Sequence, residues 1–282
     1  MSKTIVLTGA SDGIGAVAAQ DLARRGHRLF LVGRSRARTE AVAKACRAEG
    51  FFLADFEHLD QVRSLVADLR AAVSGIDVLA NNAGGLFDGP VITADGFERT
   101  LQVNHLAGVL LTHGLLDKLL ANGGAVVNTS SIGARLFGHV DLDDLNGWNK
   151  RAPNKAYGDS KLANVLFAKA LHEKYHAQGL STVSFHPGNI ATSFAADTRS
   201  YFRWVYHTGF KTFLSKPAQG GAVLAHFVEG QPGTAWQSGE YYGNNRKPGR
   251  TNRQAYDPEL VRAHWAASAQ MLGISWPGDS EG

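Results

Sequence analysis

Thr4-Ile5-Val6-Leu7-Thr8 leads directly into Gly9-Ala10-Ser11-Asp12-Gly13-Ile14-Gly15, and this stretch decides the fold class of the chain. The first five residues form a short apolar run rich in β-branched side chains, which is typical of a buried parallel strand. Residues 16–23 then place alanine and leucine with the spacing of an amphipathic helix. A strand, a glycine-rich turn and a helix in this order predict a dinucleotide-binding loop.

The three glycines of this turn have different tasks in such a loop. Gly9 permits the turn, Gly13 lets the backbone approach a pyrophosphate, and Gly15 lets the helix pack closely on the strand. The first helical turn then offers unpaired N–H groups and the positive end of the helix dipole to the phosphates. We therefore expect cofactor contacts from Gly9, Ser11, Asp12, Gly13, Ile14 and Gly15.

The end of the second predicted strand, Arg28–Val32, indicates which dinucleotide is bound. In folds that bind NAD, a carboxylate near this position usually holds the ribose 2′-hydroxyl. Here Gly33 stands in its place and Arg34 follows, and a guanidinium suits a phosphate because it donates two parallel hydrogen bonds. We predict a 2′-phosphate site and hence NADP(H). One observation opposes the NADP(H) prediction, because the Asp12 carboxylate would repel a 2′-phosphate. There is also another explanation for Arg34, since arginine is common at a solvated helix start.

The rest of the chain alternates predicted strands with helices, which indicates an α/β fold. We expect a Rossmann-type, doubly wound, mostly parallel seven-stranded sheet with helices on both faces. Its strands are expected near Ile5, Leu29, Phe52, Val78, Val126 and Val183, with a seventh at Glu240–Tyr242 on the far edge. Residues 1–282 contain no linker or repeat, so a single domain is expected, with a C-terminal extension over about 243–282.

Tyr157 and Lys161 stand four residues apart and would share one face of a helix. An adjacent cation favours the phenolate, so the pair could act as a general acid and base on an alcohol oxygen. A pair with this spacing can also arise by chance, and it gains meaning only together with the dinucleotide loop upstream.

Further motifs follow the glycine loop in order along the chain. They are Asn81-Asn82-Ala83-Gly84, Asn104 within Val103-Asn104-His105-Leu106, Ser131 within Asn128-Thr129-Ser130-Ser131, Tyr157 with Lys161, and Pro187-Gly188 with Thr192. This series resembles the short-chain dehydrogenase/reductase superfamily. Two passages, Asp95–Glu98 and Ser160–Phe167, resemble its retinol-dehydrogenase-like branch, which also includes soluble bacterial reductases.

The resemblance implies a hydride transfer between NADPH and a carbonyl carbon, with Tyr157 protonating the oxygen. Lys161 would lower the pKa of Tyr157 and bind the nicotinamide ribose, and Ser131 would donate to the substrate oxygen. Asn104 would hold a water that connects Lys161 to solvent. The choice between Ser130 and Ser131 stays open. Besides the loop residues and Arg34, the implied cofactor contacts are Asp55, Phe56, Asn82, Ala83, Gly84, Tyr157, Lys161, Pro187, Gly188, Ile190 and Thr192.

A segment over about 190–216 is expected to cover the site as a substrate lid. It is rich in aromatic residues, including Phe194, Phe202, Trp204 and Tyr206, which favours a bulky lipophilic carbonyl or alcohol substrate. The same aromatics could instead pack inside the domain, against a second copy, or on a membrane surface. Leu86, Phe87, Phe137 and Trp148 are expected on the opposite wall, and 139–154 is an insert typical of the branch.

Composition argues against several other classes of protein. The net charge is +4, but the basic residues form no stripe interleaved with aromatics, so nucleic-acid binding is not expected. The lone Cys46 excludes an internal disulfide, and no cluster of histidine and cysteine suggests a metal. Without a signal peptide or spanning segment, we expect a cytoplasmic protein with no stable membrane anchor. A homodimer or homotetramer could form through helices near Phe97–Leu120 and Ala156–Tyr175.

Two other functions share part of this pattern. Nucleotide-sugar epimerases and dehydratases can use the same Tyr/Lys pair, but they usually space their glycines differently and carry a larger C-terminal substrate domain. A non-catalytic NADP(H) sensor would keep the cofactor loop, although such proteins usually lose part of the catalytic set that this chain retains.

Overall fold

A computed structural model describes residues 2–147, 152–188 and 217–279. Within these residues, seven strands form one sheet in the order β3-β2-β1-β4-β5-β6-β7, and every neighbouring pair is parallel. The strands are β1 (Thr4–Thr8), β2 (Arg28–Gly33), β3 (Gly50–Leu53), β4 (Val78–Asn81), β5 (Ala125–Thr129), β6 (Ser181–Phe185) and β7 (Tyr241–Tyr242). The predicted Rossmann-type fold is confirmed, and β7 lies at the far edge as expected.

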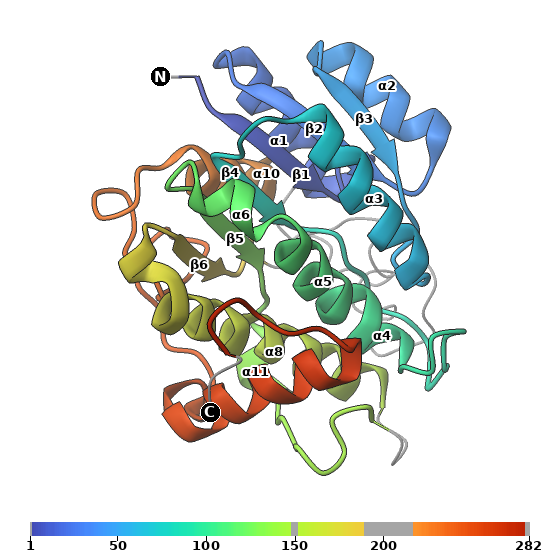
Figure 1. The fold of residues 1–282 in the computed structure, drawn as a ribbon, viewed down its shortest axis with the longest axis vertical. Coiled ribbons are helices and arrows are strands. Elements are labelled where there is room, and N and C mark those ends of the chain that lie inside the picture. The colour runs from blue at the N-terminus through green and yellow to red at the C-terminus, as the bar shows by residue number, and fades with distance from the viewer. Residues whose placement is uncertain (1, 148–151, 189–216, 280–282) are drawn as a thin grey trace, which may run out of the picture.

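Helices cover both faces of this sheet (Figure 1). Because successive side chains of a strand point to opposite faces, Ile5 and Leu7 enter one hydrophobic cluster and Val6 enters the other. The first cluster includes α1 (Gly13–Arg24), α2 (Arg36–Cys46) and α10 (Pro217–Glu229). The second includes α3 (Leu59–Ala72), α5 (Ala107–Gly114), α6 (Leu116–Leu120), α8 (Pro153–Tyr175) and α11 (Pro258–Leu272).

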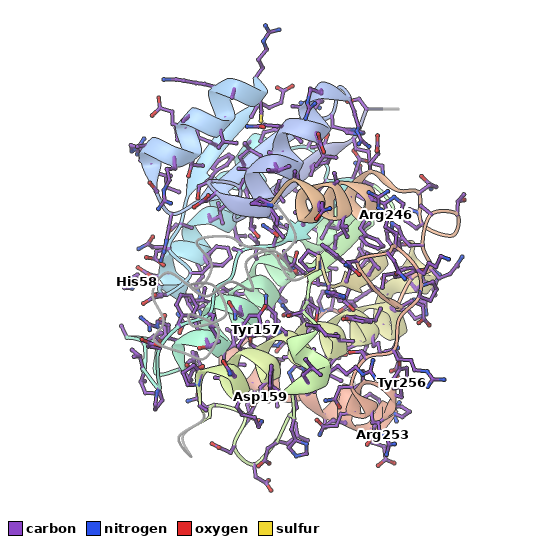
Figure 2. All side chains as sticks on the ribbon, turned by 180° about the vertical axis from the view of Figure 1, so that it is seen from behind. His58, Tyr157, Asp159, Arg246, Arg253 and Tyr256 are labelled. Carbon is purple, nitrogen blue, oxygen red and sulfur yellow. The ribbon has the colours of Figure 1, made fainter. Side chains whose placement is uncertain are left out.

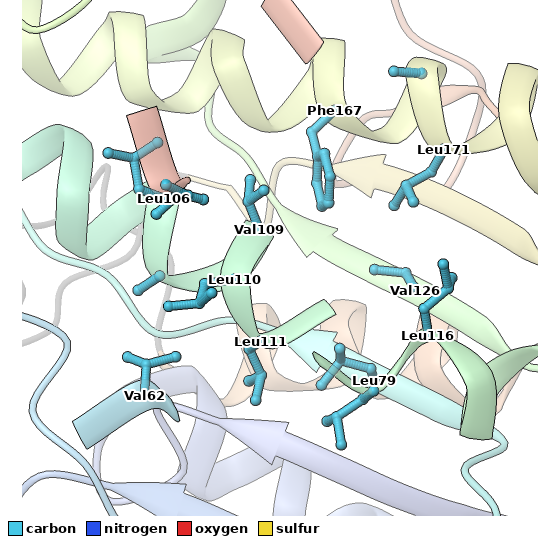
Figure 3. Packing of buried hydrophobic residues seen from close by; sticks show 14 of the residues in the cluster. Val62, Leu79, Leu106, Val109, Leu110, Leu111, Leu116, Val126, Phe167 and Leu171 are labelled. Carbon is cyan, nitrogen blue, oxygen red and sulfur yellow. The ribbon is translucent and has the colours of Figure 1, made fainter. Parts of the chain in front are cut away.

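Figure 3 shows part of the second cluster, which includes Leu79 and Val126 of the sheet together with Leu111 of α5 and Phe167 of α8. These side chains are almost fully buried, and burial of such groups stabilises a fold by roughly 1.5–3 kcal/mol per side chain. The cluster therefore fixes α5 and α8 over the centre of the sheet.

The helix expected over 97–120 is interrupted. It consists of α4 (Arg99–Leu101), a π-helix η1 (Gln102–Leu106), α5 and α6, with a break at Leu115. Gly114 lies at the end of α5, where a Cβ atom would come within 2.6 Å of Val66 on α3, so close packing of two helices shapes this break. In contrast, α8 is continuous and begins at Pro153, a residue that suits the first turn of a helix.

The C-terminal extension packs on α8. Trp265 of α11 stacks on Trp276 with ring centroids 4.2 Å apart, and on Phe167 of α8 at 5.7 Å. Ahead of α11, the short helix η5 (Arg253–Tyr256) follows Asn252, whose Nδ2 donates to the carbonyls of Ala134 and Gly138. The extension thus supports both α8 and the segment around α7 (Gly133–Leu136).

The strand order reverses direction between β1 and β4, and ligands of such sheets bind in the crevice at the carboxyl ends of the strands beside this point. The glycine loop follows β1, and Asn81–Gly84 form the end of β4 and the turn after it. The fold therefore brings the two predicted cofactor motifs to one crevice.

Gly158 tests the close packing of α8 against the backbone that follows α7. A Cβ atom there would lie 2.7 Å from the backbone nitrogen of Gly138, although alanine is the better helix former by about 1 kcal/mol. We expect Gly158→Ala to lower the free energy of unfolding by about 1–3 kcal/mol, because the clash is with backbone. Chemical denaturation measures this change. Gly108→Ala on α5, where the nearest atom would be 3.4 Å away, is the control, and equal effects of both changes would refute the packing argument.

Candidate active site

The glycine loop is shaped by close backbone contacts. Gly9 has φ +65°, and a Cβ atom on it would lie 2.8 Å from the Cα of Ala83. A Cβ atom on Gly15 would lie 2.1 Å from the carbonyl oxygen of Gly9. Asp12 caps α1 by accepting a hydrogen bond from the N–H of Gly13 at 2.6 Å. Side chains at Gly9 or Gly15 would therefore collide with the backbone of the loop itself and of the turn after β4.

Thr8, to which the sequence analysis assigned no role, joins the two cofactor motifs. Its hydroxyl oxygen accepts from the N–H groups of Asn82 and Ala83, at 2.9 and 3.0 Å. In return, the Asn82 side chain donates to the Thr8 carbonyl at 3.0 Å. These bonds hold the turn after β4 against the end of β1, next to Gly9.

Space around Gly33 explains why no carboxylate stands at the end of β2. A Cβ atom on Gly33 would lie 2.4 Å from Thr39 Oγ1 and 3.0 Å from the Cβ of Ser11. An acidic side chain therefore does not fit at this position. Arg34, the next residue, is exposed.

Asp12, whose negative charge would repel a phosphate nearby, is paired with a cation. Its carboxylate lies 3.1 Å from the Arg38 guanidinium, so the local negative charge is offset. Both side chains are about half exposed, and the pair therefore contributes little to stability.

Asp55 and Phe56 follow β3 but differ in their surroundings. Asp55 is half-buried, and its carboxylate accepts from the N–H of Glu57 at 3.1 Å. The Phe56 side chain is 6% exposed and packs in the hydrophobic cluster beside α3. Its predicted cofactor contact stays a prediction.

Tyr157 and Lys161 lie on α8 with the predicted relation, and Figure 2 labels Tyr157 on this helix. The Lys161 ammonium is 5.7 Å from the centre of the Tyr157 ring and donates to the Thr129 carbonyl at 3.2 Å. Lys161 is 2% exposed, and this burial lowers its pKa to about 8. A buried cation therefore lies beside the phenol ring.

The two serines after β5 have different surroundings. Ser130 is 1% exposed, and its hydroxyl donates to the Lys161 carbonyl at 2.7 Å, inside the fold. Ser131 is half-buried. A Cβ atom on Gly133 would lie 3.1 Å from the Tyr157 ring and 3.4 Å from the Ser131 hydroxyl oxygen, so both groups border one small volume. The geometry favours Ser131 as the hydroxyl that faces the site.

Asn104 lies in the π-helix η1 and fastens the turn after β4. Its side chain accepts from the Gly85 N–H at 2.7 Å and donates to the Gly85 carbonyl at 2.9 Å and to the Ser160 hydroxyl at 3.0 Å. A Cβ atom on Gly84 would lie 2.7 Å from Asn104 and 3.2 Å from the Lys161 ammonium. The structure thus brings Asn104 and Lys161 together, while the predicted water contact stays a prediction.

Asp159, between the two predicted catalytic residues, also received no role from the sequence. Its carboxylate accepts from the N–H of His139 at 2.7 Å and binds the Lys155 ammonium at 2.6 Å. These contacts tie the start of the 139–154 insert to α8. The i, i+4 spacing of Lys155 and Asp159 was a sequence signal for their ion pair, whereas the bond to His139 spans 20 positions and has no local signal.

The other predicted positions divide into three groups. Pro187 and Gly188 follow β6 and are half-buried, with the Gly188 N–H donating to His186 Nδ1 at 3.1 Å. Leu86 and Phe87 are buried, whereas Phe137 is 36% exposed. The predictions for Ile190, Thr192, Phe194, Phe202, Trp204, Tyr206 and Trp148 lie outside the described residues.

The described ranges hold neither a candidate metal site nor a membrane-spanning helix. Residues 2–147, 152–188 and 217–279 contain no cluster of three or more histidine, cysteine or acidic side chains placed to hold a metal ion. In the same ranges, the helices are too short or too polar to cross a membrane.

Comparison with known proteins gives the family. The model of the short chain dehydrogenase family matches residues 3–201. The chain belongs to this family. It is 40% identical over 279 residues to a Streptomyces sp. (strain C5) protein provisionally named daunorubicin C-13 ketoreductase DnrU, covering 96% of this chain and 93% of that one. It is 35% identical to human retinol dehydrogenase 13, over 99% of this chain and 87% of the relative, so the resemblance to the retinol-dehydrogenase-like branch is confirmed.

Solved structures agree with this family assignment. A protein from Mycobacterium paratuberculosis has a TM-score of 0.78 at 32% identity, covering 98% of this chain and 95% of that chain. A short chain dehydrogenase from Shigella flexneri 2a str. 301, solved in complex with NADP, has a TM-score of 0.67 at 25% identity, over 86% and 97% of the two chains. The fold and family are therefore those of an oxidoreductase.

Burial of Lys161 predicts a measurable effect on stability. The lysine pKa falls from 10.5 to about 8 on folding, so burying the charged form costs on the order of 3 kcal/mol below pH 8. This cost fades between about pH 8 and pH 10.5, where the lysine of the unfolded chain also loses its proton. We expect Lys161→Met to raise the free energy of unfolding at pH 7, with the gain shrinking towards pH 10.5, as measured by chemical denaturation across pH.

Lys174→Met, on the exposed part of α8, is the control and should bring no such gain. The Thr129 carbonyl keeps a partner in Lys161→Met, because Asn164 also donates to it at 3.2 Å. A Lys161→Met variant less stable than wild type at pH 7 would contradict the burial argument.

Proposed function

We propose that the protein is an NADP(H)-dependent oxidoreductase that interconverts a ketone or aldehyde and an alcohol on a bulky lipophilic substrate. The observation that carries this proposal is the buried Lys161 ammonium beside the Tyr157 ring, with the Ser131 hydroxyl close to that ring. A phenol, a hydroxyl and a cation at one point suit proton transfer to a carbonyl oxygen.

The residues around the crevice fit a dinucleotide. The glycine loop leaves no room for side chains at Gly9 and Gly15, and it leads into the N-terminus of α1, the end of a helix that favours phosphate groups. Gly33 excludes a carboxylate at the ribose position, which supports the 2′-phosphate form. NADPH, when bound, would supply the hydride.

The roles of the protein side chains follow from their surroundings. Tyr157 would hold the proton at its phenol oxygen and deliver it to the substrate oxygen. Ser131 would donate a hydrogen bond to the same oxygen and stabilise charge developing there. The Lys161 cation favours the phenolate left on Tyr157, since opposite charges attract strongly in a poorly solvated site. Asn104 holds the turn at Gly84 and Gly85 against these groups.

The substrate class is supported by the relatives. One is provisionally named as a ketoreductase of daunorubicin, and others are named retinol dehydrogenases. Both names refer to bulky lipophilic substrates, in agreement with the aromatic residues at 194–213. A cytoplasmic location and a homodimer or homotetramer remain our predictions for the working protein.

The phenol oxygen of Tyr157 is the first group to test. We expect Tyr157→Phe to reduce ketone turnover by about 10²–10⁴-fold, because the general acid is lost, while NADPH still binds. Rates come from NADPH absorbance over a panel of bulky ketones, and binding from NADPH fluorescence. Tyr175→Phe, which removes a buried α8 hydroxyl bonded to the Pro277 carbonyl, should leave the rate unchanged.

Undiminished turnover in Tyr157→Phe would refute this mechanism. A wild-type protein that binds NADPH, reduces none of the panel and captures a protein partner only with the cofactor would instead be a sensor.

Substitution of Arg34 tests whether the protein recognises the 2′-phosphate that distinguishes NADPH from NADH. A charge-assisted hydrogen bond contributes about 1.5–3 kcal/mol, so Arg34→Ala should weaken NADPH binding by roughly 10- to 100-fold. The affinity for NADH, which lacks the 2′-phosphate, should change by less than about 3-fold. Fluorescence titration with both cofactors measures this, and Arg63→Ala, at an exposed position of α3, is the control. Equal losses for NADH and NADPH would exclude a specific phosphate contact.

A further inference from the structure

A buried histidine lies directly behind the proposed catalytic groups. His105 follows Asn104 in the π-helix η1 and is 1% exposed. Its Nδ1 is 3.0 Å from Asn164 Oδ1 on α8, and its Nε2 is 3.3 Å from the Ser268 hydroxyl on α11. The ring therefore connects three elements at the base of the site.

The hydrogen bonds of Asn164 determine which nitrogen of His105 carries the proton. Asn164 Nδ2 donates to the carbonyls of Asn104 and Thr129, at 3.0 and 3.2 Å. Because a carbonyl can only accept, the amide nitrogen must face these two groups, and Oδ1 must face His105. His105 Nδ1 is then the N–H donor, and Nε2 accepts from Ser268.

Asn164 in turn bonds the carbonyl that binds the Lys161 ammonium, and it also bonds the backbone of Asn104. The Thr129 carbonyl accepts from both Asn164 and Lys161, and the Asn104 carbonyl belongs to the residue whose side chain fixes the turn at Gly85. A small cavity, with room for about one water molecule, borders Asn104, His105 and Asn164. Hydrogen bonds therefore add to packing in setting the orientation of these buried side chains.

We propose that His105 is a positioning residue for the reaction: as a neutral Nδ1–H donor, it orients the Asn164 amide, which holds the backbone carbonyl of Asn104 and the Thr129 carbonyl that binds Lys161. This inference rests on the proposed function.

The surroundings of the ring keep it uncharged. Lys161 and Asn164 face it from α8, His264 and Ser268 face it from α11, and the His264 ring centre is 4.9 Å away. Burial lowers the pKa of His105 to about 4 and that of His264 well below its ordinary value. Among Lys161, His105 and His264, Lys161 is then the side chain that carries a charge at neutral pH.

The kinetic test compares two buried histidines that contact each other. His105→Phe keeps a ring but removes the donor to Asn164, whereas His264→Phe replaces a ring whose Nε2 has no hydrogen-bond partner among the described residues. We expect His105→Phe to lower kcat for ketone reduction by about 10-fold or more, with KM changed by less than about 3-fold, since misplaced groups slow the chemical step. His264→Phe should stay within about 2-fold of wild type in kcat.

His105→Asn is the conservative variant, because its amide N–H can replace Nδ1–H as the donor. We expect it to recover kcat to within about 3-fold of wild type. Wild-type kcat in His105→Phe would overturn the proposal. So would equal losses in the Phe and Asn variants, which would mean that only the packing of the ring matters.

A second readout does not depend on turnover. In protein with ¹⁵N-labelled histidine, NMR distinguishes the two neutral tautomers, and the His105 signal is the one missing from the His105→Asn spectrum. We expect a neutral ring with the proton on Nδ1 at pH 7–8. A proton on Nε2, or a charged ring, would overturn the proposal even if the enzyme is active.

Failure of this role and failure of the proposed function can be told apart. A wild-type protein without Tyr157-dependent turnover would overturn the proposed function and the role of His105 together. Normal wild-type turnover with no effect of His105→Phe would overturn the role of His105 alone.

Discussion

The hydrogen bond from the buried Lys161 ammonium to the Thr129 carbonyl is the contact on which the site depends. A buried charge is costly, and no ion pair with Lys161 is found among the described residues. Its stabilisation comes from neutral dipoles at the carboxyl end of β5, where Ser130 also bonds the Lys161 backbone. The site therefore needs α8 to lie in a fixed register over β5.

Close backbone contacts provide that register. Gly158 lets α8 approach the Phe137–Gly138 backbone, and Gly133 leaves room between Tyr157 and Ser131. On the other side of α8, the stacked rings of Trp265, Trp276 and Phe167 hold the helix against the C-terminal extension. The same helix thus carries the proposed catalytic pair and much of the second hydrophobic cluster.

The fold and the cofactor loop could be predicted because their signals are local. The run of β-branched residues before Gly9 and the alternation of strands and helices are both readable along the chain. The interruption of the helix over 97–120 was missed: Gly114 was a local sign of a helix end that the prediction overlooked, whereas its close approach to Val66 on α3 joins residues far apart in the sequence. The choice of Ser131 over Ser130 also required the structure, since it depends on which side of a strand end each hydroxyl faces.

The same limit applies to the polar network. The passages containing His105 and Asn164 marked the resemblance to the branch, but their hydrogen bond joins residues 59 positions apart. Thr8 likewise bonds Asn82 across 74 positions. Thr8 and Asn82 meet where the sheet brings two strand ends together, and His105 and Asn164 meet where η1 packs on α8.

The most direct measurement of the central claim is the transfer of label to product. Protein, a bulky ketone and NADPH deuterated at the reactive C4 position are mixed, and the alcohol is analysed by mass spectrometry. The account predicts an alcohol with one deuterium on its carbinol carbon, formed in proportion to the NADPH consumed. An unlabelled alcohol, or NADPH bound without any alcohol formed from the panel of ketones, would contradict it.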